Sequence, residues 1–269
     1  MGSTMPRRTI YVTDYDRVVR QGRSQGTGPA YHPGLEVRDT ASIATSTRIW
    51  SDKFGRVIHL LSHGELEAFL QFEWLPTVVD LREQFFLDPA DTQAICKELS
   101  LIHPSVKGQP IVMTTDFVVT RRKDGREWIE AYQVKRRESD LTPRMRAKLK
   151  VESLYWERRN IKWCVLYSEE FNDLFCRNLK LLRSWRLTTL AAADFRRMLA
   201  VLRAARRQCP DEAAADVPLS KIKMTNGDLL SFGQCLKVLC AWQVVQFPIK
   251  ELAFAECPMK FFSETHHAA

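Results

Sequence analysis

The stretch IVMTTDFVVTRRKDGREWIEAYQVKRR at 111–137 decides the fold of this chain. Two runs in it, 111–120 and 127–136, alternate apolar and polar residues, and an Asp-Gly dipeptide lies between them. Alternation with a period of two is typical of half-buried strands, and Asp-Gly favours a tight hairpin turn. The stretch therefore predicts two neighbouring antiparallel strands.

These two strands also carry the candidate chemistry. Alternate residues of a strand share a face, so Gln133 and Lys135 lie together, and the short turn allows Asp116 to meet Lys135. The Asp116 carboxylate, the Gln133 amide oxygen and the Val134 carbonyl are hard oxygen ligands that suit Mg²⁺. The metal would bind a phosphate oxygen and lower the pKa of a bound water, while Lys135 orients that water or offsets charge on phosphorus. A second carboxylate is needed, and Glu65 is the candidate.

Glu65 lies at the start of a predicted helix. Residues 48–61 predict a hairpin, and Ser62 followed by Glu65 and an apolar run predicts a capped amphipathic helix that ends before Pro76. Alone, Glu65 could be only the partner in a capping box, and Lys135 only a solvated charge in a Lys-Arg-Arg run. The order of the residues along helix, strand and strand favours the functional interpretation.

The remaining pattern predicts an α/β domain followed by a mostly helical one. The first continues with a strand at 77–87, a helix from Asp88, a helix over 143–159 and a buried strand at 161–167. The second has helices at 174–185, 191–207 and 229–245, a loop at 208–218 and a short hairpin within 246–262. Three helices and a hairpin permit a winged-helix module. The expected domains are 1–170 and 171–269.

Composition excludes several classes of protein. Of 269 residues 45% are hydrophobic, no apolar run is long enough to span a membrane, and nothing at the N-terminus resembles a secretory signal; Met5 is the expected native start. The seven cysteines form an odd set without a CxxC pair, which favours a reducing cytosol over a disulfide framework or a cysteine zinc site. The net charge is +8, and residues 121–150 hold eleven Lys or Arg against five Asp or Glu, which would suit a phosphate backbone.

The order of these motifs resembles the TnsA family, the endonuclease subunit of heteromeric transposases. The resemblance spans most of 20–170 and rests on six segments: GRSQGTGPAYHPGL at 22–35, RIWSDKFGRVIHLLSHGELEAF at 48–69, VVDLREQF at 78–85, TTDFVV at 114–119, YQVK at 132–135 and LYWERRNIKW at 154–163. It implies a restriction-endonuclease-like core, in which a mixed sheet is flanked by helices. Two departures are that Gln133 stands where many related nucleases carry Glu, and that no Pro precedes Asp116.

The resemblance also implies a function. Glu65, Asp116 and Lys135 would be the catalytic set, with Gln133 as a further metal ligand. Together with the Val134 carbonyl proposed from its chemistry, the expected metal site is Glu65, Asp116, Gln133 and Val134, holding Mg²⁺, for which Mn²⁺ can substitute. The protein would nick the 5′ strands of double-stranded DNA at transposon ends in the bacterial cytosol, associated with the nucleoid. Its implied partners are a TnsB-type recombinase and a TnsC-type AAA+ regulator, with a winged-helix-like second domain contacting DNA and partners.

Other classes of function remain to be weighed. His-Gly-Glu at 63–65 matches the His-x-Glu part of the zinc deaminase signature, but no PCxxC follows, and the strand end near Leu60 disfavours a zinc site built from His59, His63 and Glu65. No phosphate-binding GxxxxGK[ST] motif occurs, which argues against an ATPase. A non-catalytic DNA-binding or assembly subunit and a standalone restriction or repair nuclease stay open as alternatives.

Overall fold

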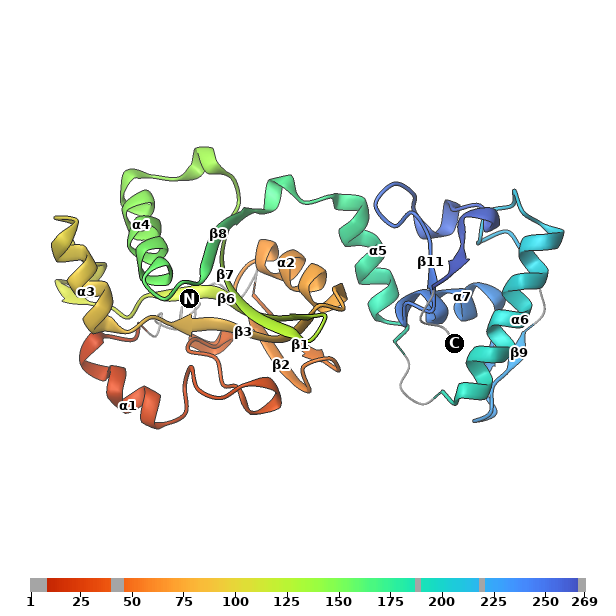
Figure 1. Cartoon of the computed structure of the whole chain (residues 1–269), viewed down its shortest axis with the longest axis horizontal. Coiled ribbons are helices and arrows are strands. Elements are labelled where there is room, and N and C mark those ends of the chain that lie inside the picture. The colour runs from red at the N-terminus through yellow and green to blue at the C-terminus, as the bar shows by residue number, and fades with distance from the viewer. Residues whose placement is uncertain (1–8, 40–45, 187–189, 218–220, 266–269) are drawn as a thin grey trace, which may run out of the picture. The chain divides into compact units, whose positions relative to one another are not determined.

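The computed structural model describes residues 9–39, 46–186, 190–217 and 221–265. The chain forms two compact units, Met1–Phe171 and Asn172–Ala269, which are described separately (Figure 1). The expected start at Met5 lies outside the described residues.

The first unit alternates strands and helices. Its helices are α1 (Tyr15–Arg20), α2 (His63–Trp74), α3 (Pro89–Glu98) and α4 (Pro143–Glu157). Its strands are β1 (Thr47–Ser51), β2 (Arg56–Leu60), β3 (Val78–Phe86), β4 (Ser105–Val106), β5 (Gln109–Pro110), β6 (Thr114–Lys123), β7 (Arg126–Lys135) and β8 (Lys162–Tyr167). The predicted hairpins β1–β2 and β6–β7 are both confirmed, the second turning at Asp124-Gly125 where both residues have positive φ.

The centre of this unit is a four-stranded sheet in the order β3-β6-β7-β8. β3 pairs with β6 and β6 with β7 in antiparallel fashion, whereas β7 and β8 are parallel and connected through α4. The predicted mixed sheet flanked by helices is therefore confirmed.

Helices cover both faces of the sheet. Phe72 of α2 packs against Phe117 and Tyr132 on one face, with ring centroids 5.6 and 5.0 Å away. Their neighbours Val118 and Ala131 face the other way and join a core with α3 and α4, two helices that lie side by side (Figure 1). The alternation read from the sequence thus separates the α2 face from the α3–α4 face.

The open edge of β3 is covered by the segment 22–39. The Tyr31 hydroxyl donates to the Glu83 carbonyl at 2.9 Å, and the Ser24 hydroxyl accepts from the Phe86 N–H at 2.8 Å. These bonds satisfy backbone groups that an edge strand would otherwise expose. At the other edge, β8 is half-buried, so the prediction of a buried strand there was wrong; an edge strand is covered less completely than a central one.

The second unit is mostly helical. It contains α5 (Asp173–Arg183), α6 (Ala192–Gln208), α7 (Phe232–Ala241) and two two-stranded sheets, β9 (Ile222–Lys223) with β10 (Leu229–Leu230) and β11 (Val245–Gln246) with β12 (Ser263–Glu264). The predicted helix over 229–245 is shorter, because Leu229 and Leu230 pair with β9 and Ser231 then caps α7. In place of the expected hairpin within 246–262, β11 at the start of this segment pairs with β12, which directly follows it.

Two general expectations concern the whole chain. All seven cysteines are free thiols. Within the described ranges, no helix is both long and apolar enough to cross a membrane. The winged-helix character of the second unit stays a prediction.

Candidate active site

The first turn of α2 places Glu65 and explains its local geometry. The Ser62 hydroxyl accepts from the Glu65 N–H at 3.1 Å and donates to Glu65 Oε1 at 3.0 Å. The N–H of Leu61 and the side-chain amide of Gln84 both donate to Glu65 Oε2, at 2.8 and 3.1 Å. Ser62 therefore caps α2, as its spacing from Glu65 predicts, but the Glu65 carboxylate bonds the Leu61 N–H and the Ser62 hydroxyl in place of the Ser62 N–H of a capping box, and it is also fixed from β3.

Glu65 shares a cavity with the other predicted residues of the catalytic set. The cavity has a volume of about 510 Å³ and lies where α2, β6 and β7 converge. Its lining consists of Ser62, His63, Gly64, Glu65, Asp116, Val134, Lys135, Arg136 and Ser168. Residues from a helix and two strands, far apart in sequence, thus meet in one place.

The strand pair β6–β7 fixes Asp116 against Lys135. Asp116 Oδ2 accepts from the Val134 N–H at 2.7 Å and lies 3.8 Å from Lys135 Nζ. Lys135 Nζ donates to the Val134 carbonyl at 2.7 Å, so this ammonium is held beside the carboxylate. The predicted proximity of Asp116 and Lys135 is what the register of the hairpin produces.

At the site, the side chains of β3 switch the face of the sheet to which they point. In the register of β3 and β6, Glu83 pairs with Phe117 and Phe85 with Thr115, so Gln84 and Asp116 lie between the same two pairs. On either side of Gln84, Glu83 binds Arg56 of β2, whereas Phe85 packs against α4, although residues two apart in a regular strand share a face. Gln84 has φ +51°, in the left-handed region, and this is the local distortion that reverses the alternation.

Burial and mutual repulsion make it unfavourable for both carboxylates of the site to be ionised without a nearby cation. The side chains of Glu65 and Asp116 are both buried. Burial raises the pKa of Glu65 to about 8, and the negative charge of Asp116 acts in the same direction. The hydrogen bonds from Leu61 and Ser62 and the charge of Lys135 act in the opposite direction. A cation placed here would relieve the repulsion.

The donor set fits a hard divalent cation. Glu65 and Asp116 supply carboxylates and Val134 lines the cavity; Gln133 adjoins the Phe117–Tyr132 pair, as Asp116 does, and its buried Oε1 has no hydrogen-bond partner. An orphaned buried amide oxygen is unusual and suits an oxygen-seeking ion. In the ranges that the structure covers, no group of three His, Cys, Asp or Glu is placed to hold a metal, so the amide and carbonyl oxygens are needed. Gln133 itself is not among the residues that line the cavity.

Glu152 is a further buried carboxylate that the sequence analysis missed. It lies on α4, and its Oε1 accepts from the Thr115 hydroxyl at 2.7 Å and from the Trp163 indole at 2.9 Å. Thr115 directly precedes Asp116, so Glu152 supports the strand behind the site. Burial raises the pKa of Glu152 to about 7, and Asp116 adds to the rise. The available signal was a carboxylate at the apolar spacing of α4, since Tyr155 and Trp156 follow it by three and four residues.

Ion pairing reduces the basic character of residues 121–150. Arg121 pairs with Glu130, Arg122 with Glu127, Arg137 with Asp140, and Arg146 with Glu138. The local excess of positive charge therefore overstates the basic surface. Arg136 is exposed and lines the cavity, next to the candidate catalytic residues.

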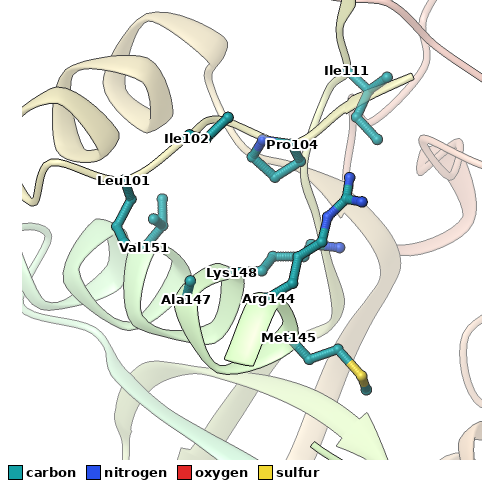
Figure 2. A pocket seen from close by; sticks show the side chains of 9 residues that line it. All are labelled: Leu101, Ile102, Pro104, Ile111, Arg144, Met145, Ala147, Lys148 and Val151. Carbon is teal, nitrogen blue, oxygen red and sulfur yellow. The ribbon is translucent and has the colours of Figure 1, made fainter. Parts of the chain in front are cut away.

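The alternative sites are poorer. His59 Nδ1 accepts from the Val37 N–H at 3.2 Å, and His63 pairs with Glu67 at 3.1 Å, so neither histidine is directed to a zinc ion with Glu65. A second cavity of about 230 Å³ lies between α4 and the segment before β4 (Figure 2). Its lining is aliphatic apart from Arg144 and Lys148, and without a carboxylate it offers no metal site.

Two comparisons bear on this site. Residues 75–168 match the family described as the TnsA-like endonuclease N-terminal domain, a span that contains Asp116, Gln133 and Lys135 but not Glu65. The chain is also 40% identical over 176 residues to the "Transposon Tn7 transposition protein TnsA" of Escherichia coli. That similarity covers 65% of this chain and 64% of the relative, so it spans slightly less than two thirds of the relative's length. The chain is therefore similar to TnsA proteins, and the matched endonuclease domain lies within the first unit, which carries the sheet and the cavity described above.

Proposed function

We propose that this chain is a Mg²⁺-dependent DNA endonuclease that nicks the 5′ strands at transposon ends during transposition. The observation that carries the proposal is the convergence of Glu65, Asp116 and Lys135 on one cavity. The two similarities support it, because the matching family is described as an endonuclease domain and the relative as a transposition protein.

The proposed metal site consists of Glu65, Asp116, the Gln133 amide oxygen and the Val134 carbonyl, with Mn²⁺ as a possible substitute for Mg²⁺. When bound, the ion supplies charge that polarises a phosphodiester and acidifies a bound water. The Val134 carbonyl accepts a hydrogen bond from Lys135, so the Lys135 ammonium would lie beside the bound ion. Gln133 must reach the cavity that its side chain does not line.

The roles of the other residues follow from their positions. The Lys135 ammonium, 3.8 Å from Asp116, orients the attacking water or offsets charge on phosphorus in the transition state. Arg136 at the rim of the cavity contacts a neighbouring phosphate. Glu152 holds Thr115, and through it the end of β6, in place.

The proposal includes an assembly. A TnsB-type recombinase would cut and join the 3′ strands, and a TnsC-type AAA+ regulator would contact the second unit, 171–269, which we propose to be winged-helix-like and to bind DNA. The first unit, 1–170, would carry the catalysis. Two alternatives give different outcomes in one experiment: a non-catalytic assembly subunit and a standalone nuclease.

The experiment is strand-resolved cleavage of a labelled transposon-end duplex with Mg²⁺. Wild type and Asp116→Ala are each incubated with and without the recombinase of the same element. A 5′-strand nick that requires the recombinase and disappears in Asp116→Ala supports the proposal. Cleavage without the recombinase favours a standalone nuclease, and a pattern unchanged by Asp116→Ala leaves the chain a scaffold.

A further inference from the structure

Gln84 combines two unusual features. It lies within β3 and is only 2% exposed, yet its φ of +51° is in the left-handed region, which residues other than glycine rarely adopt. Such a conformation costs about 1–3 kcal/mol and persists only where the surrounding structure enforces it. Backbone strain of this kind often occurs at functional sites, so the contacts of Gln84 decide what it does.

The side chain of Gln84 is directed to the candidate catalytic carboxylate. Its Nε2 donates to Glu65 Oε2 at 3.1 Å, and its neighbours Glu83 and Phe85 pair with the residues on either side of Asp116. Leu61 and Ser62, the other residues that bind the Glu65 carboxylate, belong to the cap of its own helix. Gln84 is therefore the residue that connects Glu65 to the sheet that carries Asp116.

The backbone of Gln84 is held from the opposite side by Gly34. The Gly34 N–H donates to the Gln84 carbonyl at 3.0 Å. A Cβ at position 34 would lie 2.5 Å from that carbonyl oxygen and 2.5 Å from the ring of Phe86, so glycine is required for this approach. The segment 22–39 thus fixes the strained conformation from outside the cavity.

We propose that Gln84 is a positioning residue, which holds the Glu65 carboxylate in the orientation that lets it bind a divalent cation together with Asp116. The inference rests on the proposed function, because it assigns Gln84 a role at that same metal site. Partners that orient a metal ligand typically contribute 10- to 100-fold to metal affinity. Without the amide, the Glu65 carboxylate keeps its helix cap but loses its connection to β3.

The decisive variant is Gln84→Met. Methionine has a similar length and volume and meets the same backbone strain, but it has no N–H to donate. Binding of Mn²⁺ is measured by isothermal titration calorimetry on the full chain without DNA, and thermal unfolding is followed in EDTA. We expect the Mn²⁺ dissociation constant to rise about tenfold while the chain stays folded. Gln71→Met on α2, where the amide donates to the Glu67 carbonyl of its own helix, is the matched control and should bind Mn²⁺ as wild type does.

Two further variants separate the possible outcomes. Gln84→Asn is used if Gln84→Met does not fold. Asparagine tolerates positive φ, but its side chain is one methylene shorter, so the same rise in the Mn²⁺ dissociation constant is expected. Asp116→Asn tests the proposed metal site itself. Wild-type Mn²⁺ affinity in Gln84→Met, with binding lost in Asp116→Asn, would overturn the positioning role alone. Retained binding in Asp116→Asn would overturn the proposed site and this inference with it.

Discussion

Replacing Glu65 by glutamine should stabilise the metal-free protein at alkaline pH and not at acidic pH. Because the pKa of Glu65 is raised from 4.5 to about 8, the folded chain retains a proton between these pH values that the unfolded chain has released. Stability therefore decreases as pH rises through this window. The destabilisation caused by ionising Glu65 in the folded chain is absent below pH 4.5 and complete above about pH 8.

The size of the change in stability follows from the difference between the pKa values of Glu65 in the folded and unfolded chain. The difference between 8 and 4.5 is 3.5 pH units, which at about 1.36 kcal/mol per unit sets a ceiling of about 5 kcal/mol. Glutamine preserves the volume but exchanges an acceptor for a donor opposite Ser62 or Leu61, which costs about 1 kcal/mol. Relaxation around the ionised carboxylate reduces the ceiling further. We expect Glu65→Gln to gain about 2 kcal/mol at pH 8.5 and nothing at pH 5.

The assay is urea unfolding in EDTA at the two pH values. Trp185 and Trp242 are first replaced by Phe in every protein, so that the five remaining tryptophans report the first unit alone. Glu73→Gln is the matched control, because Glu73 is the other buried carboxylate of α2 and bonds Ser51 outside the cavity. Equal changes for Glu65→Gln at pH 5 and pH 8.5, or a loss at pH 8.5, would refute the reasoning.

Two further predictions concern the walls of the cavity. Lys135→Ala should lower the single-turnover cleavage rate at least about a hundredfold. Mn²⁺ affinity should stay unchanged or become tighter, because the variant removes a cation beside the carboxylates. A parallel loss of Mn²⁺ binding would contradict this role. Gly64→Ala should destabilise the first unit by about 1–3 kcal/mol in thermal unfolding, because its Cβ would lie 2.9 Å from Cβ of Ser168. Adding Ser168→Gly should restore most of the loss, and a double variant no more stable than the single one would count against this steric explanation.

The features that were predictable from sequence are those encoded locally. Period-two alternation and the Asp-Gly turn specify the β6–β7 hairpin, and its register brings Asp116 to Lys135. The spacing of Ser62 and Glu65 specifies the start of α2. These patterns need only a few consecutive residues, so a single sequence reveals them.

The features that were missed depend on contacts between distant segments. Nothing in the local sequence of β3 indicates that Gln84 adopts positive φ, since this conformation is enforced by Gly34 and by the site itself. Glu152 is buried only because Thr115 and Trp163 come together around it. The length of α7 was overestimated because the pairing of Leu229 and Leu230 with β9 competes with helix formation.

The central claim is that the Glu65–Asp116 cavity holds a catalytic divalent cation. Anomalous diffraction from crystals of the full chain grown with Mn²⁺ tests it most directly. The account predicts an anomalous peak within coordination distance of Glu65 and Asp116, with the Gln133 amide or the Val134 carbonyl completing the set, and no such peak in crystals of Asp116→Asn. A fully ordered cavity without manganese at saturating concentration, or a peak that persists in Asp116→Asn, would contradict the account.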